Sequence, residues 1–191
     1  MWELSINEWL YNPNSTFGII FELVGEAPAL IPFCYLAFVL VGLAFDKWRV
    51  REKKWECLIF ACYLFSVLVL SAIAIEVLKR VVGRVRFRDM LPPYLEYTPF
   101  YALGHGGRSF PSGHAGMGAL SILLVDLNSK YKVFKSNTVP LAISLIFTLL
   151  VCLSRLIMGA HYLTDLLFGV LIALLSRILM KTIFFRLKIN L

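Results

Sequence analysis

The sequence predicts an all-α fold, a polytopic bundle of transmembrane helices. Of its 191 residues, 59% are hydrophobic and only 16% are charged, which is more apolar mass than a water-soluble domain of this length carries. Apolar stretches nearly free of charge recur along the chain, at about the 20 helical residues that a bilayer core requires. A water-soluble domain is therefore not expected, and residues 1–191 are treated as one integral-membrane domain.

Five stretches are predicted to span the membrane. The two clearest are residues 27–45, which carry no charge, and residues 57–78, whose single charge is Glu76. The three others are shorter or carry isolated charges, which spans tolerate when these face a bundle interior; they are residues 110–127, 138–153 and 162–180. A sixth span over residues 17–24 would be short and interrupted by Glu22, so we expect about five spans.

The first 26 residues are predicted to form a helix that lies in the membrane interface. They begin with the acidic residues Glu3 and Glu8 and lack the basic segment that opens a cleavable signal peptide. Apolar residues alternate with these charges, as in an interfacial amphipathic helix; they are Trp2, Leu4, Ile6, Trp9 and Leu10.

The distribution of Lys and Arg predicts the orientation. Twelve of the 19 basic residues lie in residues 46–56, residues 128–137 and the C-terminal end, and cytoplasmic segments hold the excess of Lys and Arg. The opposite face is then the periplasmic or outer face of the inner (plasma) membrane. So many basic residues on this outer face are unusual without a functional reason. The seven basic residues there are Lys79, Arg80, Arg84, Arg86, Arg88, Arg108 and Arg155. No basic arm stands apart from the apolar segments, so nucleic acid is not an expected partner.

Three short motifs, each at a predicted helix end, fall on that same face. In chain order they are K-x6-R at 79 and 86, P-S-G-H at 111–114, and S-R-x5-H-x3-D at 154, 155, 161 and 165. We expect the arginines that lie between or beside them to contact anionic lipid head groups as a basic collar; these are Arg80, Arg84 and Arg88.

The residue types in these motifs suit a phosphate group. Lys79, Arg86 and Arg155 supply three cations, and fixed cations and donors are what phosphoryl transfer requires. The Ser112 hydroxyl and nearby backbone N–H groups lie at a predicted helix start, where anions bind. Gly113 leaves room for the backbone to approach the anion closely.

Two histidines and a carboxylate complete the pattern. His161 and Asp165 are four residues apart, so the carboxylate can keep one imidazole nitrogen protonated and aim the other outward, as in an activated nucleophile. His114 comes from a different element and can protonate a leaving oxygen. The four cysteines lie in apolar runs without metal-ligand spacing; we expect buried thiols and no metal site.

The three motifs, in this order and spacing, resemble the signature of the type 2 phosphatidic acid phosphatase superfamily. The resemblance covers about residues 79–165 and implies that His161 attacks phosphorus to form a phosphohistidine. It further implies that Asp165 orients His161, that His114 acts as acid and then as base, and that no metal or other cofactor is required. One position departs from the family, because Phe87 follows Arg86 where the family usually has proline, which stiffens the backbone.

A site beside the bilayer suits a lipid phosphate or diphosphate, with the membrane lipid as partner. Family members include lipid A 1-phosphatases, phosphatidylglycerophosphate phosphatases and undecaprenyl diphosphate phosphatases, and the extra arginines favour lipid A 1-phosphate here. The aromatic loop 84–108 is predicted to be a head-group gate. Rival interpretations are a lipid phosphotransferase, a vanadate-dependent haloperoxidase and a non-catalytic membrane anion-binding protein. Apolar spans argue against the soluble haloperoxidases, and apolar mid-span positions without a repeat argue against transport.

Overall fold

The computed structural model describes residues 2–44, 51–92, 94 and 96–187. Within this part of the chain the regular elements are all helical, as predicted. They are α1 (Trp2–Leu10), α2 (Thr16–Val24), η1 (Ala27–Leu30), α3 (Ile31–Ala44), α4 (Arg51–Val82), η2 (Phe87–Asp89), α5 (Gly113–Ala119), η3 (Leu120–Ile122), α6 (Leu123–Tyr131), α7 (Thr138–Ile157) and α8 (Leu163–Arg186).

Four helical segments of the described chain are long and apolar enough to cross a membrane: Thr16–Ala44, Lys54–Val82, Thr138–Ile157 and Leu163–Arg186. The protein is thus an integral membrane protein. The first segment joins α2, η1 and α3, so the predicted start of this span at residue 27 is wrong. The charge of Glu22 does not interrupt it, because the Glu22 carboxylate pairs with Arg155 of α7 at 3.0 Å.

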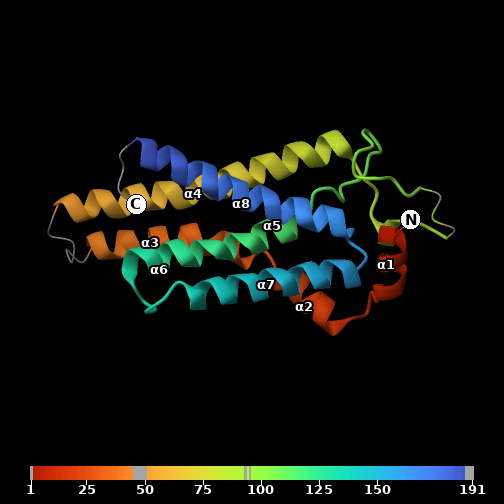
Figure 1. Cartoon of the computed structure of the whole chain (residues 1–191), viewed down its shortest axis with the longest axis horizontal. Helices are drawn as coiled ribbons and strands as arrows, with labels where there is room; N and C mark the ends of the chain where they lie inside the picture. Colours follow the sequence, from red (N-terminus) through yellow and green to blue (C-terminus); the bar gives the residue numbers. More distant parts are fainter. Residues whose placement is uncertain (1, 45–50, 93, 95, 188–191) are drawn as a thin grey trace.

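The predicted span over residues 110–127 folds as three short elements in succession, α5, η3 and α6. They run along the bundle between the longer helices (Figure 1), and α5 contacts α4, α7 and α8. Close packing of α5 on α8 needs Gly169, since a Cβ there would lie 2.4 Å from the Ser112 carbonyl oxygen. This segment is shorter and less apolar than the others because protein, rather than lipid, surrounds it.

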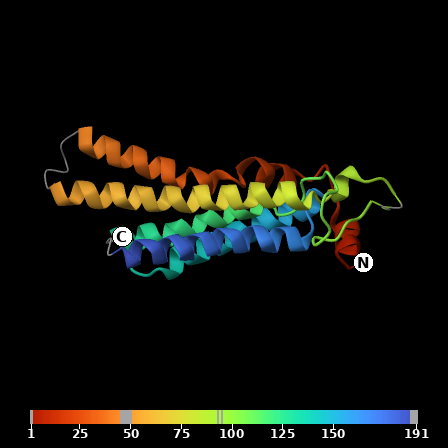
Figure 2. The ribbon, with the colours of Figure 1, turned by 90° about the horizontal axis from the view of Figure 1, so that it is seen from above.

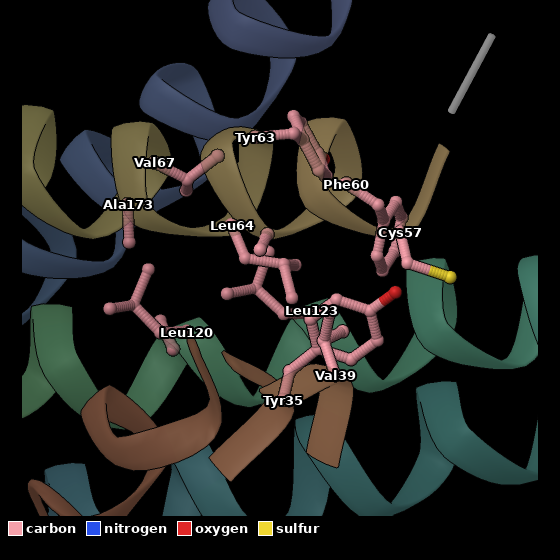
Figure 3. Close-up of a cluster of buried hydrophobic side chains, with 12 residues drawn as sticks. Tyr35, Val39, Cys57, Phe60, Tyr63, Leu64, Val67, Leu120, Leu123 and Ala173 are labelled. Atoms are coloured by element: carbon pink, nitrogen blue, oxygen red, sulfur yellow. The ribbon is translucent and has the colours of Figure 1, made fainter. Parts of the chain in front are cut away.

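The main apolar core lies between α3, α4, α6 and η3. Figure 3 shows Tyr35 and Val39 of α3 meeting Phe60 and Leu64 of α4, with Leu123 of α6 beside them. The outer surfaces of α7 and α8 expose large apolar side chains, as helices facing lipid do. The expectation of buried cysteines is right for Cys57, whereas Cys152 is half-buried, and it is wrong for Cys34 of α3 and Cys62 of α4, which are exposed.

One end of the bundle collects the segments that carry the motifs. Figures 1 and 2 place α1, the loop 84–108 and the starts of α5 and α8 at this end. The α6–α7 connection and the end of α8 lie at the opposite end, as the basic segments require (Figure 1). Residues 46–50 and 188–191, which hold further basic residues of the predicted cytoplasmic side, are outside the described residues.

Of the 26 residues predicted to lie in the interface, only Trp2–Leu10 forms a separate helix, α1, which has a buried polar face; Thr16–Val24 belongs to the first long apolar segment. Trp2 and Trp9 are 60% and 84% exposed, whereas Glu3 and Asn7 are 4% and 0% exposed. Exposed tryptophans at a bundle end suit the membrane–water interface. The buried Glu3 and Asn7 show that α1 is also part of the protein interior.

Candidate active site

The three motifs meet where α4 ends, α5 begins and α7 passes into α8. Lys79 lies in the last turn of α4, and Arg86 follows four residues after the end of that helix. Arg155 is in the last turn of α7, and His161 lies in the connection to α8. The positive charges of Lys79 and Arg155 both act on His161, and those of Lys79 and Arg86 act on each other. Two of the three predicted cations therefore lie near the predicted nucleophile, and the third lies near Lys79.

Two of the three cations hold N–H groups without a partner. Arg155 is 2% exposed, and only its Nη2 is paired, to a Glu22 carboxylate oxygen at 3.0 Å. Its Nε and Nη1, like Nε of Arg86, are buried without a hydrogen-bond partner in the described part of the chain. A buried unsatisfied donor costs about 1–3 kcal/mol. These donors can be satisfied by an anion bound between Arg86 and Arg155.

The start of α5 differs in part from expectation. The Ser112 hydroxyl oxygen accepts a hydrogen bond from the Ala115 N–H at 3.2 Å, so it caps α5. The Ser112 N–H donates to the Asp165 carbonyl at 2.8 Å and is not available to an anion. A Cβ at Gly113 would lie 3.1 Å from Nζ of Lys79. The absence of a side chain at Gly113 thus lets the Lys79 ammonium approach the start of this helix.

His161 is held in one tautomer. Its Nδ1 lies 2.7 Å from the Ser109 carbonyl oxygen, which can only accept, so Nδ1 carries the proton and Nε2 keeps its lone pair. The predicted partner Asp165 is farther away, with Oδ2 3.7 Å from Nδ1. Oδ2 instead accepts from the Ser109 hydroxyl at 2.5 Å and the Tyr162 N–H at 3.0 Å. Ser109, which the sequence analysis missed, therefore orients His161 directly.

Burial controls the protonation of His161. The side chain is almost fully enclosed, and loss of hydration lowers the pKa of His161 to about 4. The Asp165 carboxylate acts in the opposite direction, and the positive charges of Arg155 and Lys79 add to the lowering. His161 is consequently neutral at pH 7, as a nucleophile must be.

Arg84 is not part of a lipid-facing collar, so that expectation is wrong. Its side chain is fully buried and donates to Asp165 Oδ1 at 2.6 Å. The Arg84 guanidinium also donates hydrogen bonds to the Thr98 carbonyl at 2.8 Å and to the Glu3 carboxylate at 2.9 Å. Nothing in the local sequence separates Arg84 from its basic neighbours, because its partners come from distant segments.

His114 lies between two acceptors. Its Nε2 is 3.1 Å from the Glu22 carbonyl oxygen, and its Nδ1 is 3.1 Å from Oε1 of Glu26. Burial and the charge of Arg155 lower the pKa of His114, although the acceptor at each nitrogen favours the doubly protonated ring. Glu22 and Glu26 were not predicted as site residues, since the segment that carries them was assigned to the membrane interface.

The remaining cations lie at the edge of this site. Arg88 approaches Glu22 at 3.7 Å, and Arg108 shares the exposed Glu76 with Arg80 at 2.8 Å and 3.0 Å. The described residues contain no cluster of three or more His, Cys, Asp or Glu side chains able to hold a metal ion.

The loop 84–108 is only partly the exposed aromatic gate that was expected. Phe87, at the position of the family's proline, is 2% exposed and packs against Tyr11 with ring centroids 5.2 Å apart. Phe100 packs on Phe110 and Phe168. Tyr101, by contrast, is 73% exposed. Packing of Phe87 therefore holds the start of the loop in place of proline, while the exposed part remains available to a head group.

Comparison with known proteins agrees with this geometry. The family model described as PAP2 superfamily matches residues 60–189, which include all three motifs. A curated protein from Rhizobium etli named lipid A 1-phosphatase is 31% identical over 152 residues, 76% of this chain. The match spans 60% of that relative's length. No solved structure matches the chain. The family match confirms the resemblance drawn from the motifs: the chain belongs to the PAP2 superfamily.

Proposed function

We propose that the protein is a membrane lipid phosphatase that hydrolyses a lipid phosphate monoester or diphosphate without a metal ion. The observation that carries the proposal is the set of guanidinium N–H groups on Arg86 and Arg155 that have no partner among the described residues, near a buried neutral His161. An anion satisfies these donors, and a neutral imidazole with a free Nε2 can attack it. Membership of the PAP2 superfamily and the similarity to a protein named lipid A 1-phosphatase support the same activity.

The reaction proceeds in two steps. Nε2 of His161 attacks phosphorus, the bond from phosphorus to the lipid oxygen breaks, and His114 gives that oxygen a proton. Water then attacks the phosphohistidine, His114 takes a proton from the water, and the phosphorus–nitrogen bond breaks to release inorganic phosphate. Lys79, Arg86 and Arg155 stabilise the charge on the phosphoryl oxygens, with the Ser112 hydroxyl and the space at Gly113 completing the cradle.

Protonation of His114 depends on the bound substrate. In the empty site, burial and Arg155 oppose the proton that Glu26 and the Glu22 carbonyl favour. A phosphate group brings negative charge next to Arg155, which offsets the repulsion from that guanidinium and favours the protonated ring. His114 is then protonated when a leaving oxygen is present to receive its proton.

The substrate class follows from the position of the site at a bundle end. A lipid tail can stay in the bilayer while its phosphate reaches the cations. The excess of basic residues at the other end supports a site on the periplasmic face of the inner membrane. We propose lipid A 1-phosphate as the substrate, with phosphatidylglycerophosphate and undecaprenyl diphosphate as the alternatives.

A panel of lipids tests the proposed function. Detergent-purified protein is expected to release inorganic phosphate in the presence of EDTA, because the described site relies on Lys and Arg side chains for charge. The panel holds lipid A, phosphatidylglycerophosphate, phosphatidic acid and undecaprenyl diphosphate, and lipid A is expected to be hydrolysed fastest. Phosphate transfer only when a second lipid is added would indicate a phosphotransferase. Anion binding without any turnover would indicate a binding protein.

The pH dependence tests the state of His161. Protonation of His161 removes the nucleophile, and its lowered pKa of about 4 places this loss well below neutral pH. We therefore expect kcat/KM to survive acidification from pH 7 to about pH 5, since a pKa of 6.5 would already remove most of the neutral form there. The profile is corrected for the titration of the lipid phosphate, which is measured separately by ³¹P NMR. A fall in kcat/KM as the pH drops through about 6.5, remaining after this correction, would contradict the assignment.

A further inference from the structure

We propose that α1 is a positioning element for the nucleophile, acting through Glu3 and Asn7; this rests on the proposed function of His161. The two residues are four apart and therefore share one face of α1. Both are buried, at 4% and 0% exposure; Asn7 contacts the connection that carries His161, and Glu3 contacts the first turn of α8 that follows it. A helix that only binds the membrane interface needs neither buried polar side chains nor contacts with the segment around His161.

The contacts fix the backbone at His161 and three residues after it. The Asn7 amide donates to the backbone carbonyl of His161 at 3.1 Å. Three residues further on, the Thr164 N–H at the start of α8 donates to Oε1 of Glu3 at 2.9 Å. Two side chains of α1 thus fix the backbone on which the imidazole is mounted.

A second connection runs from Glu3 through Arg84 to Asp165. Oε2 of Glu3 lies 2.9 Å from Nη2 of Arg84, whose Nη1 lies 2.6 Å from Asp165. Burial opposes ionisation of Glu3, but hydrogen bonds from Thr164 and Arg84 outweigh it and hold the pKa of Glu3 below its usual value. Arg84 is therefore shared between two carboxylates, both buried.

This sharing matters at the step in which His161 becomes positively charged. Formation of a phosphohistidine puts positive charge on the ring, and the Asp165 carboxylate stabilises it. Without the charge of Glu3, Arg84 would act on Asp165 alone and reduce that stabilisation. Glu3 is thus a positioning residue that tunes Asp165, and it does not itself touch the substrate.

Replacement of Glu3 by glutamine tests the proposal. Glutamine keeps an oxygen for the Thr164 N–H but removes the charge, so we expect kcat to fall about tenfold while KM stays within about twofold. Single-turnover measurement should assign the loss to phosphoenzyme formation. The matched control is Glu8→Gln, which removes an exposed carboxylate from the same helix and should keep wild-type kcat. Asn7→Ala, which removes the bond to the His161 carbonyl, should also lower kcat at unchanged KM.

All rates are taken per folded protein, from monodisperse material whose unfolding temperature is measured alongside. If Glu3→Gln and Asn7→Ala both match Glu8→Gln in kcat, α1 does not position the nucleophile. A loss of total activity that only equals the loss of folded protein would likewise assign α1 a purely structural role. Failure of the proposed function looks different, because wild-type protein would then release no phosphate or would keep its activity after loss of the His161 imidazole.

Discussion

Replacing His161 by asparagine is expected to lower kcat by at least about a thousandfold, because it removes the atom that attacks phosphorus. The asparagine amide can still donate near the position of Nδ1, so the hydrogen bond to the Ser109 carbonyl, 2.7 Å in the native protein, can be retained. The variant should therefore fold normally and still bind lipid phosphate. Phosphate release and lipid binding are measured on the same detergent-purified sample.

The control for this variant is loss of a buried polar side chain that takes no part in the chemistry. Ser71→Ala serves, because the buried Ser71 hydroxyl lies outside the three motifs and donates to the Val67 carbonyl within α4, at 2.8 Å. It should keep kcat within about threefold, as a single neutral hydrogen bond contributes only about 1 kcal/mol. Phosphate release by His161→Asn at a rate near that of Ser71→Ala would remove His161 from the mechanism.

Replacing Arg155 by methionine is expected to lower kcat/KM by about a thousandfold, the upper range for one group that stabilises transition-state charge. Two of its N–H groups have no partner among the described residues and are available to the phosphoryl oxygens. The change also leaves the Glu22 carboxylate, now without its 3.0 Å partner, facing the anion.

The double variant Arg155→Met with Glu22→Gln separates these two effects. It removes the paired charges together, so kcat/KM should recover about tenfold relative to Arg155→Met alone. Arg155→Lys keeps the charge but loses the planar fork, and it should remain well below wild type. A loss of less than about tenfold in Arg155→Met would show that the unpartnered guanidinium does not hold the phosphate.

Much of the fold could be predicted because apolar length and motif order are local properties of the sequence. The helical class, the two clearest spans and the meeting of three motifs at one bundle end all follow from such properties. The start of the first span could not be predicted, because it depends on a pairing between Glu22 and Arg155, 133 residues apart. The segment 110–127 was assigned as one helix, although it consists of three short elements shielded by neighbours.

In the candidate site, too, residues with a fixed local spacing could be predicted, and residues contributed by distant elements could not. The proposed nucleophile, acid and cations were found because their spacing is fixed within each motif. The residues that hold them were missed because they come from other elements: Ser109 beside His161, Arg84 on Asp165, and Glu26 on His114. Arg84 in particular looks like its exposed neighbours in sequence, and only the buried carboxylates around it distinguish its role.

Trapping the phosphoenzyme tests the central claim most directly. Protein mixed with ³²P-labelled lipid phosphate and quenched within one turnover should carry label that is stable in alkali and labile in acid, as a phosphohistidine is, and peptide mapping should place it at residue 161. Loss of the proposed acid and base in His114→Ala should slow both steps, and His161→Asn should carry no label. Turnover by wild-type protein without label at His161, or label that persists in His161→Asn, would contradict the account.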